Sequence, residues 1–165
     1  MSALFNPELM RSLDATHIGT IGEYFVASVL GGYGYEVIHA AGKGFDLLVM
    51  PVGHGDHPIR VDVKTKSHDD GHRVFSIKKG KTTTFRGYEL GSCDLFALLC
   101  LEDMSLSFDL CEDFDGRASL YLNREAHKRV DPYDSWRGAV QRLLSRNDTA
   151  PQSGRHIKSA HNSGQ

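Results

Sequence analysis

The chain has 165 residues and a net charge of −2, and 40% of its residues are hydrophobic and 24% charged, which fits one soluble domain with a sizeable core. No apolar run approaches the roughly 18 residues that cross a bilayer. The first residues, MSALFNPELMRS, lack the basic flank and apolar stretch of a signal peptide. These features exclude a membrane protein, and we expect the chain in the cytoplasm with no membrane partner.

Hydrophobic periodicity predicts one domain at 1–145, followed by a disordered polar tail at 146–165. The predicted elements are, in chain order, a helix at 17–30, strands at 35–41, 45–52, 59–67 and 73–77, a buried strand at 94–101, two less buried strands at 105–112 and 118–123, and a helix at 134–144. Asp134 is expected to cap the last helix. This order indicates an α/β layered domain with a mixed central sheet.

The first predicted helix places Ile18, Ile21, Phe25 and Val29 on one face. It ends in GGYG (31–34), which is typical of a helix C-cap. These glycines follow a helix and precede a strand, the reverse of the order in a dinucleotide-binding loop. We therefore expect no organic cofactor.

Cysteine and histidine spacing argues against a zinc site. The three cysteines are odd in number and lack CxxC spacing, which predicts reduced, packed thiols; they are Cys93, Cys100 and Cys111. The histidines of the two turns around the third strand have spacings that can suit a metal, but loop histidines among Gly and Asp are more often solvated; they are His54, His57, His68 and His72.

Charge is divided unevenly along the chain. From Arg60 to Arg86 there are eight Lys or Arg and three Asp, a local net charge of +5, whereas Gly87 to Asp115 has eight acids and no Lys or Arg. The basic block is where a polyanion is expected to dock, and a solvated hairpin explains the charge alone equally well.

The stretch VDVKTKS (61–67) carries too much charge for a buried strand. Side chains alternate in a strand, so Asp62, Lys64 and Lys66 share one face. If the strand that starts near Asp46 pairs with this one, Asp46 and Asp62 converge. Two converging carboxylates repel one another, and a hard divalent cation such as Mg²⁺ relieves that repulsion. Taken singly, these charges also fit a protected sheet edge or a turn.

The set formed by Glu23 in a helical GE, Asp46 in GFDLLV, and Asp62 and Lys64 in VDVK resembles the PD-(D/E)XK nuclease superfamily. It looks most like the small bacterial endonuclease-like branch and is similar in layout to the archaeal Holliday junction resolvases. The resemblance covers roughly residues 17–101. It implies a restriction-endonuclease-like three-layer fold, with a mixed central β-sheet flanked by helices.

The resemblance also implies roles for individual residues. Asp46, Asp62 and the backbone carbonyl of Val63 would hold Mg²⁺, for which Mn²⁺ can substitute, and Lys64 would position the attacking water. Glu23 matches the helix glutamate that contacts the metal or its water shell. Two residues depart from the pattern: Phe45 replaces the name-giving proline, and Asp62 stands where glutamate is more frequent.

The predicted function is metal-dependent hydrolysis of phosphodiester bonds in DNA, that is, a Mg²⁺-dependent endodeoxyribonuclease. Basic residues on and after the third strand are expected to contact the nucleic acid; they are Lys66, Lys78, Lys79, Lys81 and Arg86. Cutting both strands of a duplex needs two sites or two visits, which favours a homodimer. One alternative is a non-catalytic nucleic-acid-binding module that keeps the nuclease fold. Another is a metal-free domain whose acidic second half binds a basic partner.

Overall fold

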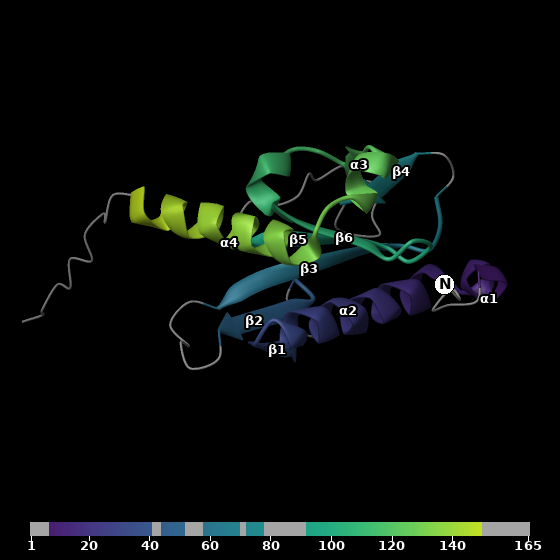
Figure 1. Cartoon of the computed structure of the whole chain (residues 1–165), viewed down its shortest axis with the longest axis horizontal. Helices are drawn as coiled ribbons and strands as arrows, with labels where there is room; N and C mark the ends of the chain where they lie inside the picture. The colour runs from purple at the N-terminus through teal and green to yellow at the C-terminus, as the bar shows by residue number, and fades with distance from the viewer. Residues whose placement is uncertain (1–6, 41–43, 52–57, 70–71, 78–91, 150–165) are drawn as a thin grey trace, which may run out of the picture.

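The computed structural model describes residues 7–40, 44–51, 58–69, 72–77 and 92–149 (Figure 1). The helices are α1 (Pro7–Ser12), α2 (Ala15–Gly32), α3 (Arg124–Lys128) and α4 (Pro132–Thr149), with a 3-10 helix η1 at Cys111–Phe114. The strands are β1 (Tyr35–His39), β2 (Leu47–Pro51), β3 (Ile59–Lys66), β4 (Arg73–Ser76), β5 (Leu95–Cys100), β6 (Ser105–Leu110) and β7 (Ser119–Leu122). All predicted strands are present, whereas α1, η1 and α3 were not expected from the sequence.

The central sheet has five strands in the order β1-β2-β3-β5-β6. β3 and β5 are parallel, and the other neighbours are antiparallel. The prediction of an α/β fold with a mixed central sheet is therefore confirmed. β4 pairs with β7 in a separate two-stranded sheet.

α2 packs closely on β3 because of one glycine. A Cβ atom on Gly22 would lie 2.8 Å from Cβ of Thr65, closer than two side-chain atoms can approach. The buried face of α2 is consequently Gly22, Val26 and Leu30, one position round from the predicted stripe, whose members are only partly buried. The helix begins after Asp14, which accepts a hydrogen bond from the backbone N–H of His17 at 2.9 Å.

α4 begins earlier and ends later than predicted. Asp131 rather than Asp134 caps it, because Asp131 Oδ1 accepts the backbone N–H of Asp134 at 2.9 Å and Pro132 occupies the first turn. The helix continues to Thr149 and so includes 146–149 of the predicted tail, while 150–165 lie outside the described residues. Within the described chain, no helix has the length and apolar character needed to cross a membrane.

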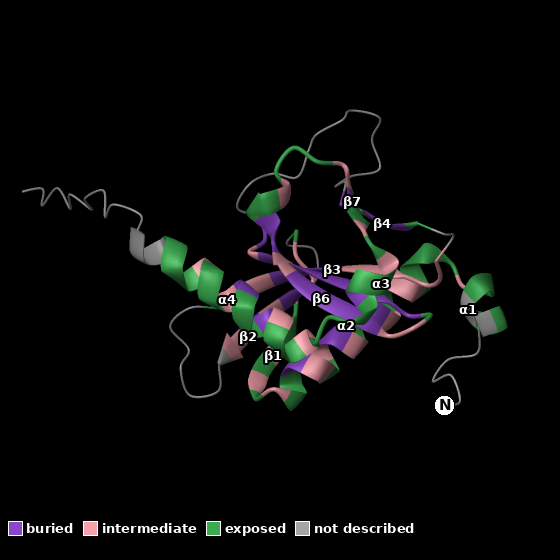
Figure 2. Ribbon diagram, turned by 45° about the horizontal axis from the view of Figure 1, so that its top comes forward, coloured by how far each residue is buried: buried purple, intermediate pink, exposed green. Residues whose placement is uncertain are grey.

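Among the described residues, two hydrophobic cores lie against the sheet, and Figure 2 shows that much of β3 and β6 is buried. The first contains the buried residues of α2 together with Trp136 of α4, and alternate residues of β3, β5 and β6. The second lies under the β4–β7 sheet and includes Phe75, Phe96 and Leu120. The prediction that β6 is less buried is wrong, since five of its six residues are buried. Ser135 of α4 also covers the outer edge of β6, because its hydroxyl group hydrogen bonds to both the N–H and the C=O of Phe108.

A disulfide joins Cys93 to Cys111. β5 and β6 are antiparallel, with Leu95 opposite Leu110. Cys93 just before β5 and Cys111 just after β6 therefore meet, although 18 positions separate them in the sequence. The prediction of three reduced thiols is therefore wrong for this pair, because it rested on spacing in the sequence without the strand register. Cys100 is a free, buried thiol.

Candidate functional site

The predicted site lies where β3 continues beyond β2. β3 pairs with β5 from Val61 to Lys66, but with β2 only from Ile59 to Val61. The part of β3 after Val61 therefore has an edge that β2 does not cover. Asp46 directly precedes β2, and extending the Leu47–Val61 register by one residue places Asp46 opposite Asp62. Directly opposed residues of antiparallel strands have Cβ atoms roughly 5 Å apart.

Backbone hydrogen bonds hold Asp46 in this position. Its N–H donates to the carbonyl oxygen of Val61 at 3.0 Å, and its own carbonyl oxygen accepts the N–H of Ala40 at 2.8 Å. Its side-chain oxygen Oδ2 accepts the backbone N–H of Val63 at 2.7 Å. In an extended strand the N–H and C=O of one residue point to the same side, so the Val63 carbonyl also points to the open edge.

The two aspartates form an electrostatically strained pair. Asp62 is only 3% exposed, and Lys64 Nζ lies 2.7 Å from its Oδ1. Burial, together with the negative charge of Asp62, raises the pKa of Asp46 to about 7, and the hydrogen bond from Val63 only partly opposes these effects. A hydrogen bond between the two carboxyl groups contributes to the raised pKa. Below pH 7, the carboxyl group of Asp46 is therefore mostly protonated.

Glu23 approaches this pair from α2, one residue after the glycine that brings the helix onto β3. Its charge also raises the pKa of Asp46, although it is the smallest of the causes. Among the described residues, Glu23 does not join the two aspartates in a group whose ligand atoms all lie within 4.8 Å of one another. The fold thus gathers Asp46, Asp62 and Lys64 tightly, with Glu23 further out.

The other charges on this face of β3 also have partners. Arg60, a residue with no role predicted from the sequence, donates hydrogen bonds to Asp94 at 2.6 Å and 3.1 Å and so ties β3 to β5. Lys66 Nζ donates to the carbonyl oxygen of His72 at 3.3 Å, at the start of β4. The remaining predicted DNA-contacting residues fall outside the described ranges; they are Lys78, Lys79, Lys81 and Arg86.

A second group of potential metal ligands lies near the start of β4. Ligand atoms of Asp69, Cys100 and Glu102 lie within 4.8 Å of one another. However, Asp69 Oδ2 accepts two hydrogen bonds from the buried Arg73, at 3.0 Å and 2.8 Å, and Arg73 also bonds to Asp103 at 2.7 Å. The guanidinium group already occupies the place of a cation, so we interpret this group as an ion-pair network that supports the fold.

Of the four histidines considered from the sequence, two lie in the described ranges. His68 Nδ1 is 2.8 Å from the hydroxyl of Ser67, and His72 is exposed and supplies its carbonyl oxygen to Lys66. His54 and His57 fall outside those ranges.

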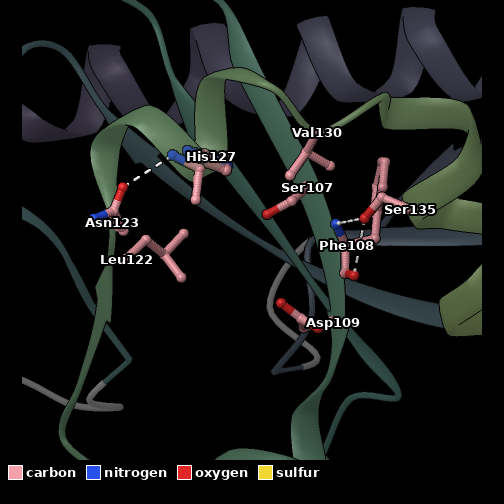
Figure 3. Close-up of a pocket in the computed structure, with 9 residues that line it drawn as sticks. Ser107, Phe108, Asp109, Leu122, Asn123, His127, Val130 and Ser135 are labelled. Atoms are coloured by element: carbon pink, nitrogen blue, oxygen red, sulfur yellow. Dashed lines mark hydrogen bonds between the residues drawn. The ribbon is translucent and has the colours of Figure 1, made fainter.

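A pocket of about 270 Å³ lies between β6, α3 and the start of α4 (Figure 3). The polar groups in it serve the fold. Asn123 Oδ1 accepts the backbone N–H of Ala126 at 2.9 Å and caps α3, and Ser135 holds the backbone of Phe108. His127, at 3% exposure, has a pKa lowered to about 4 by burial and by Arg73, and is therefore neutral.

The acidic second half of the chain is largely paired within the molecule. Arg142 of α4 lies 3.2 Å from Asp109 and 3.0 Å from Asp113. Arg146, one turn later, contacts Asp113 and Glu112. These contacts join α4 to η1, so the acids that suggested a basic partner already face arginines of their own chain.

The architecture is a nuclease-like α/β fold. A solved structure to which the chain is similar is that of I-Ssp6803I, a bacterial homing endonuclease, with a TM-score of 0.55 and 16% sequence identity. The similarity covers 83% of this chain and 99% of that one. No protein-family model matches the chain, and no curated protein matches it. At this identity the likeness concerns the fold, and the function has to be argued from the residues.

Proposed function

We propose that the protein is a Mg²⁺-dependent endonuclease that hydrolyses phosphodiester bonds in DNA, with Mn²⁺ able to replace Mg²⁺. The observation that carries this proposal is the convergence of the half-buried Asp46 with the buried Asp62, whose carboxyl groups hydrogen bond to one another, with Lys64 at 2.7 Å from Asp62. Such convergence costs stability in the metal-free protein and is typical of functional sites. The nuclease-like fold supports the same conclusion.

The donor set fits a hard divalent cation. In this proposal Asp46, Asp62 and the carbonyl oxygen of Val63 are the metal ligands, and all three oxygens belong to the class that Mg²⁺ prefers. Each carboxyl group has a second oxygen besides the one that contacts Val63 or Lys64. A divalent charge would displace the proton held by Asp46 and remove the repulsion between the two acids.

Each side chain then has a distinct task. When bound, the cation would supply a water of lowered pKa and stabilise negative charge on the phosphate. Lys64 would orient the attacking water and offset the charge that develops in the transition state. Glu23, which stands further from the two aspartates, would hold the outer water shell of the site.

Contact with DNA follows from the basic face beside the site. Lys66 lies two residues after Lys64 on the same side of β3, so their Cα atoms are roughly 7 Å apart along the strand. We propose that Lys66 and the basic residues of 78–86 contact phosphates. A homodimer would allow both strands to be cut, and light scattering of the purified protein measures this directly.

Nicking of supercoiled plasmid DNA tests the proposal. We expect cleavage with Mg²⁺ that stops in EDTA and falls by at least 10²-fold in Lys64→Ala and Asp62→Asn, because each variant removes a group that acts at the reacting phosphate. Arg137→Ala is the control, since this exposed α4 arginine contacts Asp134 rather than the site. Cleavage that survives in both site variants would refute the assignment.

The same experiment separates the enzyme from a non-catalytic module. A binding module would retain DNA equally well in Mg²⁺ and in EDTA, and it would cut the DNA in neither condition. Including linear, nicked, branched and single-stranded DNA and RNA in the panel identifies the substrate class.

A further inference from the structure

His39 lies beside the proposed site, although nothing in its sequence context indicated this. It is the last residue of β1 and pairs with Leu47 of β2. The next backbone N–H, that of Ala40, donates to the carbonyl oxygen of Asp46 at 2.8 Å. The backbone of His39 is therefore tied to the segment that positions Asp46.

The imidazole of His39 contacts two consecutive residues of α2. Its Nδ1 lies 3.8 Å from Oε2 of Glu23, and its ring centroid lies 4.6 Å from that of Tyr24 with the planes tilted by 42°. The side chains of His39 and Glu23 are 38% and 33% exposed, and Tyr24 is 65% exposed. Because all three side chains reach solvent, packing in the core does not explain their arrangement.

We propose that His39 is a positioning residue of the nuclease site, which orients Glu23 toward Asp46 while Tyr24 fixes the plane of the imidazole. This inference rests on the proposed function. A free glutamate side chain has many rotamers, and a ring nitrogen 3.8 Å from its carboxylate favours those rotamers that keep the carboxylate close to it. Partners that orient the residues around a metal site affect both metal affinity and rate when they are removed.

Two substitutions of similar size distinguish positioning from packing. In His39→Asn the amide nitrogen takes a place close to that of Nδ1, whereas His39→Leu removes the polar atom. We expect His39→Leu to weaken Mn²⁺ binding by roughly 3- to 10-fold in calorimetric titration of the metal-free protein, at or below the lower end of the usual range because the contact is partly exposed. His39→Asn should restore most of the affinity.

The rate of plasmid nicking should fall in parallel. We expect a lower kcat for His39→Leu with KM within about twofold of wild type, because the residue acts on the site rather than on DNA binding. Both variants should unfold in EDTA at the same urea concentration. His17→Asn and His17→Leu are controls, because His17, six residues before Glu23 on α2, also contacts a carboxylate, that of the N-cap residue Asp14 at 2.9 Å.

The outcomes separate this inference from the proposed function. If His39→Leu binds Mn²⁺ as tightly as wild type, or if His39→Asn is no better than His39→Leu, then His39 is not a positioning residue, while Lys64-dependent nicking by wild type would leave the nuclease function intact. If the folded wild-type protein neither binds Mn²⁺ nor cuts DNA, both proposals are wrong.

Discussion

Replacing Asp46 by Asn should stabilise the metal-free protein at alkaline pH while abolishing its activity. The fold raises the pKa of Asp46 from an ordinary 3.8 to about 7, so the folded state favours the protonated carboxyl group. Between these two values the folded protein holds a proton that the unfolded chain has released, and stability falls as the pH rises. Above pH 7 the full penalty is present. Asparagine carries no charge, and it can still accept the N–H of Val63 and donate to Asp62.

The size of the effect follows from the shift. A shift of about three pKa units corresponds to roughly 4 kcal/mol as an upper limit. Asp46 is partly exposed, and solvent screening reduces this to about 1–2 kcal/mol. We therefore expect Asp46→Asn to raise the free energy of unfolding by about 1–2 kcal/mol at pH 8 and to leave it nearly unchanged at pH 4.5, where the wild-type carboxyl group is mostly protonated.

Urea unfolding in EDTA, followed by the fluorescence of the buried Trp136, measures this difference between pH 4.5 and pH 8.5. Adding Mg²⁺ at pH 8 should stabilise the wild type but not the variant, since only the wild type has the complete ligand set. Glu36→Gln, an exposed change on β1, should remain within about 0.5 kcal/mol throughout. A variant that is less stable than wild type at pH 8, or equally shifted at both pH values, would show that the two carboxylates do not repel one another in the fold.

Two further predictions concern the framework. Gly22→Ala should destabilise the protein by about 1–3 kcal/mol, because the new methyl group would collide with Thr65. Gly19→Ala should stabilise it by about 0.5–1 kcal/mol, because a methyl group there meets no atom within 4 Å. Chemical denaturation compares the two variants, and equal effects would contradict the close approach of α2 to β3. Thiol titration of the unfolded chain should find one free thiol before reduction and three after it. Reduction of the disulfide should lower the free energy of unfolding by about 3 kcal/mol. Three free thiols before reduction would exclude the bond between Cys93 and Cys111.

The sequence predicts the sheet well because alternation and apolar runs are local signals. The continuous apolar run of β5 and the alternating charges of β3 each identify a strand without knowledge of its neighbours. The convergence of Asp46 and Asp62 depends on the pairing of their two strands, and the structure shows that β2 and β3 do pair antiparallel.

Features that depend on contacts between distant segments could not be predicted. β6 alternates like a half-exposed strand, but it is buried because α4 packs against it. The disulfide depends on the register between β5 and β6. Arg60 resembles any other basic residue of the block until β5 brings Asp94 to it, and the contact of His39 with Glu23 depends on how α2 crosses β1.

The brief pairing of β2 with β3 makes the register of this hairpin a functional constraint. A single inserted residue between Asp46 and Leu47 would turn the carboxyl group of Asp46 to the opposite side of the sheet, away from Asp62, while most of the hydrophobic core stayed in place. Such a variant would fold but would lack the paired acids. Length changes in the chain between β2 and β3 carry no such consequence as long as the three paired residues keep their partners. As the sequence diverges, insertions should therefore be tolerated in the segment that connects β2 to β3. They should be excluded at the three paired positions beside Asp46.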